Sequence, residues 1–446
     1  MLCELLNSLY YQCPGKSQCI VFAAYHQSLG CELNFFAMPY KAIFRYVLWL
    51  VLPCFTLAAQ AQYFDITSHK KRVVIPFHLV RNLVIIQLKI NNKGPFNFIM
   101  DTGAGLMVIT DPTLIDSVNI PSKRIIKLTG ACSERNDYDA YVTSILKVDI
   151  PGLTSYNVSA AILKTDHFGL SNFVGMPIHG LLGYEFFSNL AVKVNFSDST
   201  ITVYRPKDER LFNKGDRIPI SIEKGKPYVQ ATLHMPDGSV KDSKLVIDLG
   251  AGHPLSLENC SETHDLPKKC IAANLGVGFN GPITGFISRI NEIDIGKYDI
   301  KNLISSFPED DSVSRMLETK RDGNLGIGLL KRFAVVFDYS ANVIYLKRGP
   351  HYNDPFEHDM SGLEYYAAGD DYKRIIISRV EPGSAGDRIG LEKDDEIVSI
   401  NLKPITDMSL EQVDDLFKSQ DDRSLLLGIY HDKRVDQVVI TLKRRI

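Results

Sequence analysis

The sequence predicts a mostly β chain in which two related lobes are followed by a smaller α+β domain. Three observations lead to this prediction. Apolar residues alternate or run in short stretches bounded by Gly, Pro, Asn and Asp, which is typical of strands. A set of short motifs occurs twice, in the same order, between residues 73 and 348. Beyond Arg348 the motifs stop, and a linker rich in Pro, His and Asp follows.

The composition is that of a globular protein. The chain has 446 residues, of which 45% are hydrophobic and 23% are charged, and this length suits about three domains. The formal net charge of -2 shows no basic excess, which argues against a nucleic-acid partner. The sequence contains no Cys-x-x-Cys, His-Glu-x-x-His or Gly-Lys-Thr/Ser motif, so we expect no metal and no other cofactor.

Residues 38–61 are typical of a signal peptide. A basic segment that begins at Met38 precedes an apolar stretch from Tyr46 to Ala58, and Ala59-Gln60-Ala61 has the small-x-small form of a signal-peptidase site. The stretch of about 13 apolar residues is shorter than the roughly 20 that a spanning helix needs. We therefore expect an exported protein, periplasmic or secreted, with no stable membrane span in the mature chain.

Residues 1–37 precede this signal and have two interpretations. They are either the result of a translation start placed too far upstream or a genuine extension, which would make the signal internal. This segment carries four of the eight cysteines. In the mature chain Cys260 and Cys270 are close enough in sequence to form a local disulfide in an oxidising compartment, and Cys132 is expected to be a single buried residue.

The repeated motif centres on an aspartate. Asp101-Thr102-Gly103-Ala104-Gly105 and Asp248-Leu249-Gly250-Ala251-Gly252 each follow a strand-like apolar run. Val148-Asp149-Ile150 and Ile293-Asp294-Ile295 end 49 and 47 residues after the respective aspartates. Gly180 to Tyr204 then aligns without a gap to Gly323 to Lys347. The conserved order indicates an internal duplication, with lobe one at residues 73–206 and lobe two at residues 207–348.

With these motifs, the lobes resemble the aspartic peptidases of the pepsin and retropepsin kind, in particular the bacterial retropepsin-like branch with both lobes in one chain. In that family each lobe supplies one aspartate from a hydrophobic-hydrophobic-Asp-Thr/Ser-Gly-Ala loop, which a hydrophobic-hydrophobic-Gly motif braces. Ile99 to Ala104 matches this loop, with Leu181-Leu182-Gly183 as its brace. Val246 to Ala251 matches except at Leu249, and its brace, Asn324-Leu325-Gly326, departs from the pattern at Asn324.

The resemblance implies two retropepsin-like acid protease barrels and a catalytic pair, Asp101 and Asp248. Two carboxylates about 3 Å apart repel by roughly 5 kcal/mol at an effective dielectric near 20, so they share one proton, as is established for the dyads of this family. Eight residues would support the two loops: Thr102, Gly103, Ala104, Gly183, Leu249, Gly250, Ala251 and Gly326. Thr102 would hydrogen-bond to the opposite loop, whereas Leu249 has no hydroxyl with which to return that bond. The glycines are expected to allow tight turns.

Two hairpins are candidate flaps that would cover a bound peptide. One is the glycine-rich segment from Gly276 to Gly285 in lobe two, and the other is the polar segment from Gly130 to Tyr141 in lobe one. Ordinary hairpin turns are the alternative for both. His253 follows the second motif directly. We expect it to be a structural or cleft-wall residue rather than a proton carrier.

The C-terminal segment, residues 361–446, carries a second set of motifs. Gly362-Leu363-Glu364-Tyr365, Glu381 to Ala385, Gly390-Leu391 and Asp394 to Asn401 follow one another in order. This string resembles a PDZ domain of the bacterial protease-associated type. The resemblance implies that backbone amides near residues 363–365 receive the carboxylate of a C-terminal peptide tail, which adds as a strand beside a helix near residues 410–417. Val413 and Phe417 would line this groove, unless the domain only packs on the lobes.

Two functions remain open at this point. The first is an exported aspartic endopeptidase that cleaves peptide or protein substrates and uses its PDZ domain for substrate or partner tails. The second is a non-catalytic peptide-binding protein on the same fold. Retention of both Asp101 and Asp248 favours the enzyme, whereas Leu249 and Asn324 favour the binding protein.

Overall fold

The computed structural model describes residues 63–67, 70–120, 123–129, 137–206, 215–258, 266–278, 281–309 and 319–446. The expected signal peptide, the segment upstream of it, Cys132 and Cys260 lie outside these residues. The described residues all belong to one compact unit. Cys270 is a free, half-buried cysteine. None of the described helices is long and apolar enough to cross a membrane.

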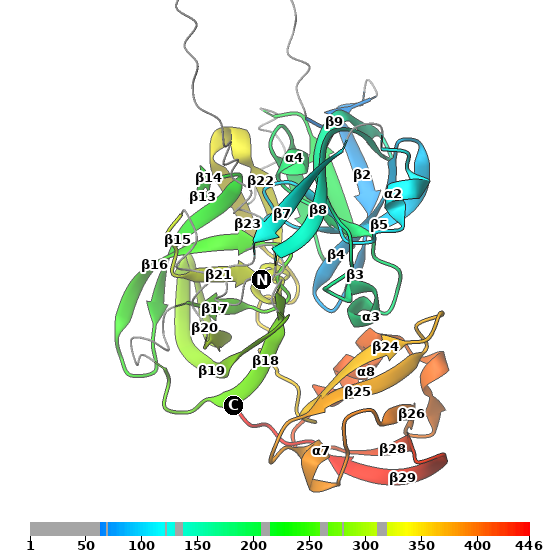
Figure 1. Cartoon of the computed structure of the whole chain (residues 1–446). Helices are drawn as coiled ribbons and strands as arrows, with labels where there is room; N and C mark the ends of the chain where they lie inside the picture. Colours follow the sequence, from blue (N-terminus) through cyan, green and yellow to red (C-terminus); the bar gives the residue numbers. More distant parts are fainter. Residues whose placement is uncertain are drawn as a thin grey trace, which may run out of the picture. The chain divides into compact units, whose positions relative to one another are not determined.

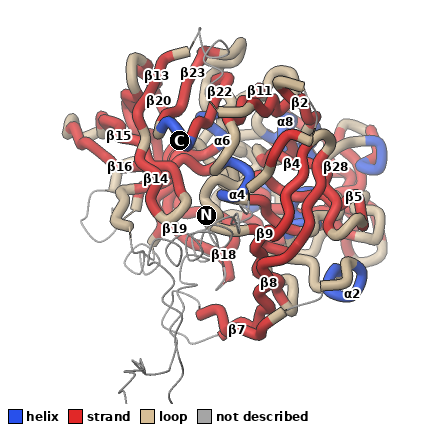
Figure 2. Tube along the Cα trace, turned by 90° about the horizontal axis from the view of Figure 1, so that it is seen from above, coloured by secondary structure: helices blue, strands red, loops and turns tan. Residues whose placement is uncertain are grey.

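The described chain is mostly β, as predicted, and its helices are short (Figures 1 and 2). Lobe one contains β1 (Asp65–Ile66), β2 (Arg72–Pro76), β3 (His78–Val80), β4 (Leu83–Ile90), β5 (Lys93–Met100), β6 (Met107–Ile109), α2 (Leu114–Ser117), β7 (Arg124–Thr129), β8 (Asp137–Ile150), β9 (Leu153–Leu163), α3 (Leu170–Val174), β10 (Gly180–Leu182), α4 (Tyr184–Phe187), β11 (Ala191–Asn195) and β12 (Thr200–Tyr204).

Among the described residues, lobe two repeats the order of strands that begins at β2 in lobe one. It contains β13 (Asp216–Pro219), β14 (Ser221–Glu223), β15 (Lys226–His234), β16 (Val240–Asp248), β17 (Leu255–Leu257), β18 (Ile271–Gly278), β19 (Gly281–Ile295), β20 (Tyr298–Pro308), β21 (Gly323–Gly326), α6 (Ile327–Leu330), β22 (Phe333–Asp338), η4 (Tyr339–Ala341) and β23 (Val343–Arg348).

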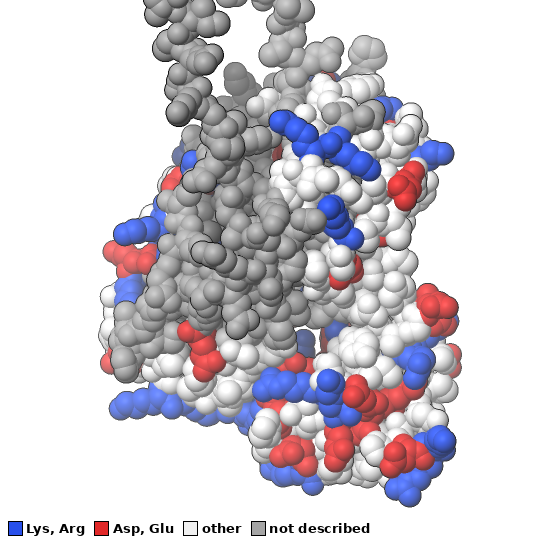
Figure 3. Space-filling model, in the orientation of Figure 1, with Lys and Arg blue, Asp and Glu red and all other residues white. Residues whose placement is uncertain are grey.

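The C-terminal domain has its own sheet and the predicted helix. Its elements are β24 (Leu363–Ala368), β25 (Arg374–Val380), α7 (Ala385–Arg388), β26 (Glu396–Ile400), β27 (Lys403–Pro404), η5 (Ile405–Asp407), α8 (Leu410–Phe417), β28 (Ser424–His431) and β29 (Arg434–Thr441). Ser409 and Gln412 form a capping box that starts α8. A separate apolar core lies between this sheet and α8. On the face shown in Figure 3, described basic and acidic side chains are interspersed over this domain.

Three sheets build the lobes. Lobe one has a sheet in the order β1-β9-β6-β10-β5-β4-β8-β7, with β3 on β4, and lobe two has one in the order β14-β15-β16-β21-β17-β20-β19-β18. The third sheet, β13-β23-β22-β11-β12-β2, takes strands from both lobes, and β11 and β22 pair across the junction. Phe187 packs edge to face on Phe337 there, with ring centroids 5.4 Å apart. The duplicated lobes therefore share one continuous apolar core.

Strand register places the two aspartates equivalently. In lobe one β10 pairs in parallel with β5, so that Leu182 lies beside Met100. In lobe two β21 pairs in parallel with β16, so that Leu325 lies beside Ile247. Each aspartate therefore lies at the end of a strand that runs parallel to the short strand of its brace motif.

Candidate active site

Both aspartates are buried at the ends of these strands, Asp101 with 0% and Asp248 with 1% of its surface exposed. The brace strands hold the loops through backbone hydrogen bonds. Asp101 N donates to Leu182 O at 2.9 Å, and Tyr184 N donates to Ala104 O at 2.9 Å. In lobe two Ile327 N donates to Ala251 O at 2.8 Å. Residues 101–105, the first aspartate loop, and residues 248–252, the second aspartate loop, are thus fixed by their own lobes.

The two loops approach each other through their glycines. A Cβ atom added at Gly250 would lie 2.1 Å from Asp101 Oδ2, and one added at Gly103 would lie 2.9 Å from Asp248 Cγ. Each carboxyl group therefore lies against the glycine of the opposite loop, where no side chain fits. Lack of space, rather than a left-handed backbone, is the reason for these glycines, because neither has a positive φ. The sequence analysis expects these glycines to allow tight turns, and it does not predict that they make room for the carboxyl group of the opposite loop.

Each carboxylate is also held by its own loop. Gly103 N donates to Asp101 Oδ1 at 2.8 Å, and Gly250 N donates to Asp248 Oδ1 at 2.7 Å. Hydrogen bonds to the ionised form stabilise it and lower a carboxyl pKa. The backbone hydrogen bonds of each loop therefore favour the ionised form of its aspartate over the neutral form.

Thr102 joins the two loops. Its hydroxyl donates to Ile247 O at 2.7 Å and accepts from Leu249 N at 2.9 Å. These are the cross-lobe contacts that the sequence leads us to expect of Thr102. Leu249 is fully buried in the apolar core and returns only its backbone N–H. Lobe one thus contributes a hydrogen-bonding side chain to the contact between the loops, and lobe two contributes an apolar side chain at the corresponding position.

Asn324, in the second brace, contacts an aspartate directly. Its Nδ2 donates to Asp248 Oδ2 at 2.7 Å, and its side chain is fully buried. Burial favours the neutral form of Asp248, and the hydrogen bonds from Asn324 and Gly250 oppose this effect because they favour the carboxylate. From the sequence alone, Asn324 is only a departure from the brace pattern. The signal for its contact with Asp248 is that it is a polar residue in an otherwise apolar motif.

Tyr339 is a second residue that sequence reasoning missed. Its hydroxyl is buried without a hydrogen-bond partner among the described residues. Burial, followed by the charges of Tyr184, Asp248 and Asp101, raises its pKa well above the ordinary value of 10. Tyr339 therefore stays neutral, and it stacks on Tyr184 with ring centroids 6.2 Å apart. Together these rings provide low-polarity surroundings for the aspartates.

Glu185 in α4 of lobe one is a buried carboxyl next to Tyr184 in the sequence. Burial raises its pKa from 4.5 to about 7. Its Oε2 has no hydrogen-bond partner in the part of the chain that the structure describes. A carboxyl in this state is protonated in mildly acidic solution and becomes charged only near neutral pH and above.

The structure describes only some of the other residues that were predicted to lie at the cleft. His253 O accepts from Gly328 N at 3.2 Å, which gives this residue a structural contact beside the second aspartate loop. In the lobe-two hairpin, Gly276 and Gly278 belong to β18 and residues 279–280 lie outside the described residues. Residues 130–136 of the lobe-one hairpin also lie outside them. The flap roles therefore stay predictions.

The predicted peptide groove of the C-terminal domain is in contact with lobe one. Arg81 binds Asp414 of α8 at 3.1 and 3.2 Å, and its Nη1 donates to Tyr365 O at 3.2 Å. Asn172 Nδ2 donates to Ala367 O at 2.8 Å. Tyr365 and Ala367 belong to β24, the edge strand to which a ligand strand would add. These contacts support the alternative in which the domain packs on the lobes.

The other residues named for this groove are largely internal. Val413 and Phe417 are fully buried in the core of the C-terminal domain, and Leu363 is nearly so. Glu364 is partly exposed and pairs with Arg379 at 2.7 Å. Gly362 has a φ of 74° and approaches Ser384, to whose Cβ an added Cβ would lie 2.1 Å. Val413 and Phe417 therefore stabilise the domain rather than present an open lining.

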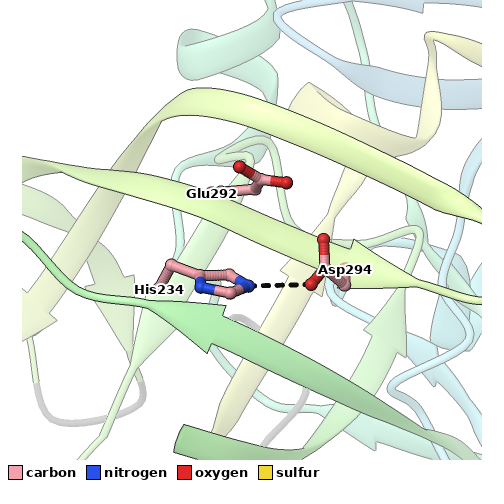
Figure 4. A group of neighbouring side chains, drawn as sticks. All are labelled: His234, Glu292 and Asp294. Atoms are coloured by element: carbon pink, nitrogen blue, oxygen red, sulfur yellow. Dashed lines mark hydrogen bonds and ion pairs between the residues drawn. The ribbon is translucent and has the colours of Figure 1, made fainter. Parts of the chain in front are cut away.

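One group of described residues has the composition of a metal site. His234, Glu292 and Asp294 offer ligand atoms within 4.8 Å of one another (Figure 4). The His234 ring binds Asp294 at 2.8 Å, and Lys301 lies 3.9 Å from Glu292. All three members are partly exposed on paired strands β15 and β19, and the His234–Asp294 hydrogen bond and the Lys301–Glu292 ion pair account for their arrangement. Cross-strand register forms this group, so no sequence spacing predicts it.

Two family models match the chain, one for aspartyl proteases over residues 86–186 and one for PDZ domains over residues 376–430. Residues 86–186 are an aspartyl protease domain, and residues 376–430 are a PDZ domain. The aspartyl protease match includes Asp101 and its brace at Gly183. It ends before Asp248, so the assignment of lobe two depends on the internal duplication and on the register of β16 with β21.

The chain is similar to three solved structures among others. Basic 7S globulin from soybean is 11% identical, with 65% of this chain and 99% of that chain covered and a TM-score of 0.37. The aspartic proteinase from Irpex lacteus is 11% identical, with 64% and 99% covered and a TM-score of 0.43. The photosystem II D1 C-terminal processing protease is 21% identical over 19% of this chain and 22% of that chain, with a TM-score of 0.18. No curated protein matches the chain.

Proposed function

We propose that this protein is an aspartic-type endopeptidase that hydrolyses peptide bonds with a water molecule activated by Asp101 and Asp248. The observation that carries the proposal is the crossed approach of the two loops, in which each buried carboxyl group lies against the glycine of the opposite loop. This arrangement brings two carboxyl groups from separate strands into one buried space, and the backbone N–H groups of Gly103 and Gly250 each donate to one of them.

The chemistry follows from the repulsion between two carboxylates in such a space. One proton is shared, so one carboxyl is ionised and the other is protonated near neutral pH. The ionised member accepts a proton from water as the water oxygen attacks the scissile carbonyl carbon. The protonated member gives its proton to the carbonyl oxygen. When the C–N bond breaks, the carboxyl that took the proton from water delivers it to the leaving nitrogen.

For the PDZ domain we propose a role in holding peptide or protein tails near the lobes. The family match supports peptide binding. Because Arg81 and Asn172 already donate to carbonyls of β24, a tail that adds to this strand must displace them. Fluorescence anisotropy with a library of labelled C-terminal peptides tests this role. Tighter binding by an Arg81→Ala, Asn172→Ala double variant supports it, and no binding by either protein contradicts it.

We further propose that the protein is exported, to the periplasm or outside the cell. The support is the pattern of residues 38–61, with its apolar stretch and Ala59-Gln60-Ala61. Mass spectrometry of the protein recovered from an expressing bacterium tests this directly. A mature N-terminus at Gln62 is expected, whereas a retained residue 38–61 segment in the cytoplasmic fraction contradicts export.

A non-catalytic peptide-binding protein is the second candidate, and Leu249 is the observation that favours it. The missing hydroxyl removes one half of the polar connection between the loops. Thr102 nevertheless makes both of its cross-lobe hydrogen bonds. A lost hydrogen bond typically costs about 1 kcal/mol, and the shared sheet and core between the lobes offset a loss of that size.

Digestion of a mixed peptide library separates the two candidates. Protein that begins at Gln62 is incubated with the library from acid to neutral pH, beside Asp101→Asn and Asp248→Asn variants. Cleavage by the unmodified protein that both substitutions abolish supports the peptidase. Binding of peptides without cleavage at any pH supports the recognition protein. Cleavage that persists in either variant shows that another group carries the reaction.

A further inference from the structure

We infer that the groove of the PDZ domain recognises a peptide tail that carries an arginine side chain, and that Arg81 of lobe one occupies the place of that side chain. The inference rests on the proposed role of the PDZ domain in holding peptide tails, and it names the class of tail. Asp414 of α8 is the residue that selects the arginine.

The guanidinium group of Arg81 makes several kinds of contact with the PDZ domain. Its Nε and Nη2 donate to the two carboxylate oxygens of Asp414 at 3.2 and 3.1 Å, and its Nη1 donates to Tyr365 O at 3.2 Å. Its central carbon lies over the Tyr365 ring, 4.9 Å from the ring centroid. Only 9% of the Arg81 side chain is exposed. A two-point bond to a carboxylate and contact with an aromatic ring together favour arginine over other side chains.

Most of this arginine site belongs to the PDZ domain itself. The Tyr365 hydroxyl donates to Asp414 Oδ1, which keeps the carboxylate beside the ring without help from lobe one. Lobe one adds Phe173, whose ring centroid lies 4.9 Å from the central carbon of the guanidinium group and whose carbonyl oxygen accepts from Nη1 at 3.0 Å. The PDZ domain therefore supplies the acidic group, one ring and one carbonyl oxygen, all of which a peptide tail can reach when Arg81 is displaced.

Lobe one also takes backbone hydrogen bonds that a ligand strand would make. Asn172 Nδ2 donates to Ala367 O at 2.8 Å, and Arg81 Nη1 donates to Tyr365 O. Tyr365 and Ala367 are two residues apart on β24, and carbonyl groups at this spacing point to the same side of a strand. Because β24 is an edge strand, a peptide that adds to it binds these carbonyl groups. Arg81 therefore lies where a side chain of the bound peptide would lie.

The charge of Asp414 selects among peptide tails. Only 16% of its side chain is exposed, so the carboxylate is largely removed from water. A tail that displaces Arg81 without supplying a cation removes the positive partner of this carboxylate, which costs affinity. Lysine supplies a single point charge, whereas arginine restores both the two-point bond and the ring contact. The expected order of affinity is therefore arginine, lysine, an uncharged side chain and, weakest, an acidic side chain.

Fluorescence anisotropy with matched peptides tests this order. A C-terminal peptide with uncharged side chains receives Arg, Lys, Gln or Glu at each of its last few positions in turn. The parent protein is the full chain with Asp248→Asn, so that the peptides stay intact. At one position we expect Arg to bind at least about tenfold more tightly than Gln, the size of one hydrogen bond to a charged group. Arg81→Ala should bind that arginine peptide more tightly than the parent protein, because the internal occupant is gone.

Two neighbouring aspartates of α8 supply the matched variants. Asp414→Asn should lose the preference for arginine, whereas Asp415→Asn removes the same charge from an exposed residue and should keep it. These two variants and the parent protein decide the inference even if Arg81→Ala does not fold. Equal binding of the Arg and Gln peptides, or a preference that persists in Asp414→Asn, overturns the inference and leaves the peptide-binding role standing. A lack of binding by every peptide removes both.

Discussion

The two lobes have the same backbone around their aspartates but different side chains. Gly180-Leu181-Leu182 and Gly323-Asn324-Leu325 pair in the same parallel register with the strands that precede the aspartates. Lobe one supplies the hydroxyl of Thr102 to the connection between the loops, and lobe two supplies the amide of Asn324 to an aspartate. Duplication thus preserved the scaffold while each copy took a separate part of the polar contacts.

A second difference lies just beyond the brace motifs. Glu185 in α4 corresponds to Gly328 in α6 when Gly183 is aligned with Gly326. Lobe one buries a carboxyl at this position, whereas a Cβ atom at Gly328 would lie only 2.7 Å from Pro254 N. The chain passes so close in lobe two that no side chain fits. The lobes therefore differ in ionisable groups as well as in hydrogen bonds.

The largest expected effect comes from the aspartates themselves. General acid and base catalysis each contribute about 10² to 10⁴-fold, so both Asp101→Asn and Asp248→Asn should reduce kcat/KM by at least that range. Steady-state kinetics on one cleaved peptide measure both losses, and a variant that keeps nearly full activity would contradict the shared dyad.

Glu185 should make stability depend on pH. Its carboxyl ionises at 4.5 in its ordinary state and at about 7 in the folded protein. Because the folded pKa is raised, the stability is fully present below about pH 4.5, falls as pH rises toward 7 and stays low above it, by roughly 3 kcal/mol in total. Chemical denaturation from pH 4 to 8 measures the change.

Glu185→Gln is the control for this dependence. The variant should lose that portion of the pH profile and become at least as stable as the unmodified protein near pH 8. Parallel profiles for the two proteins would show that Glu185 does not titrate as a buried acid.

Thr102→Val should destabilise the protein by about 1–3 kcal/mol, because Ile247 O and Leu249 N lose their buried hydroxyl partner. Thr143→Val is a matched control: its hydroxyl is also buried but has no hydrogen-bond partner among the described residues. That variant should be neutral or slightly more stable. Denaturant titration of both compares them, and similar losses would mean that the cross-lobe bonds add little.

The smallest expected effect separates the two loop glycines. Gly250→Ala should cost about 1 kcal/mol more stability than Gly103→Ala, within the usual range for an overpacked site. The added Cβ would lie 2.1 Å from an Asp101 oxygen in the first case and 2.9 Å from the Asp248 carboxyl carbon in the second. Thermal unfolding of the two variants measures the difference. The reverse order would contradict the described approach of the loops.

Local patterns in the sequence predicted the fold well. The duplicated motifs, the strand periodicity and the helix at residues 410–417 all depend on neighbours within a few residues. The repeated motifs and their resemblance to aspartic peptidases led to the prediction that Asp101, Asp248 and Thr102 belong to one site. Their crossed approach through Gly103 and Gly250 could not be predicted in detail, because it depends on the packing of one lobe against the other.

The residues that sequence reasoning missed act over long separations. Asn324 and Tyr339 approach the aspartates only after β21 and β22 take their places in the sheets. Arg81 reaches Asp414 from a turn between two strands, a contact that joins residues 333 positions apart in the sequence. No periodicity or motif predicts such contacts, because the tertiary structure alone brings their partners together.

The proposal that this is a catalyst, and not a recognition protein, has one most direct test. Calorimetry compares the affinity of the unmodified protein for a cleaved peptide with that for the same peptide in which a tetrahedral secondary alcohol replaces the scissile amide. Asp248→Asn protein supplies the affinity for the uncleaved amide. A catalytic dyad should bind the tetrahedral form at least about 10²-fold more tightly, since enzymes bind analogues of the transition state better than substrates. Equal affinity for the two peptides would contradict the account.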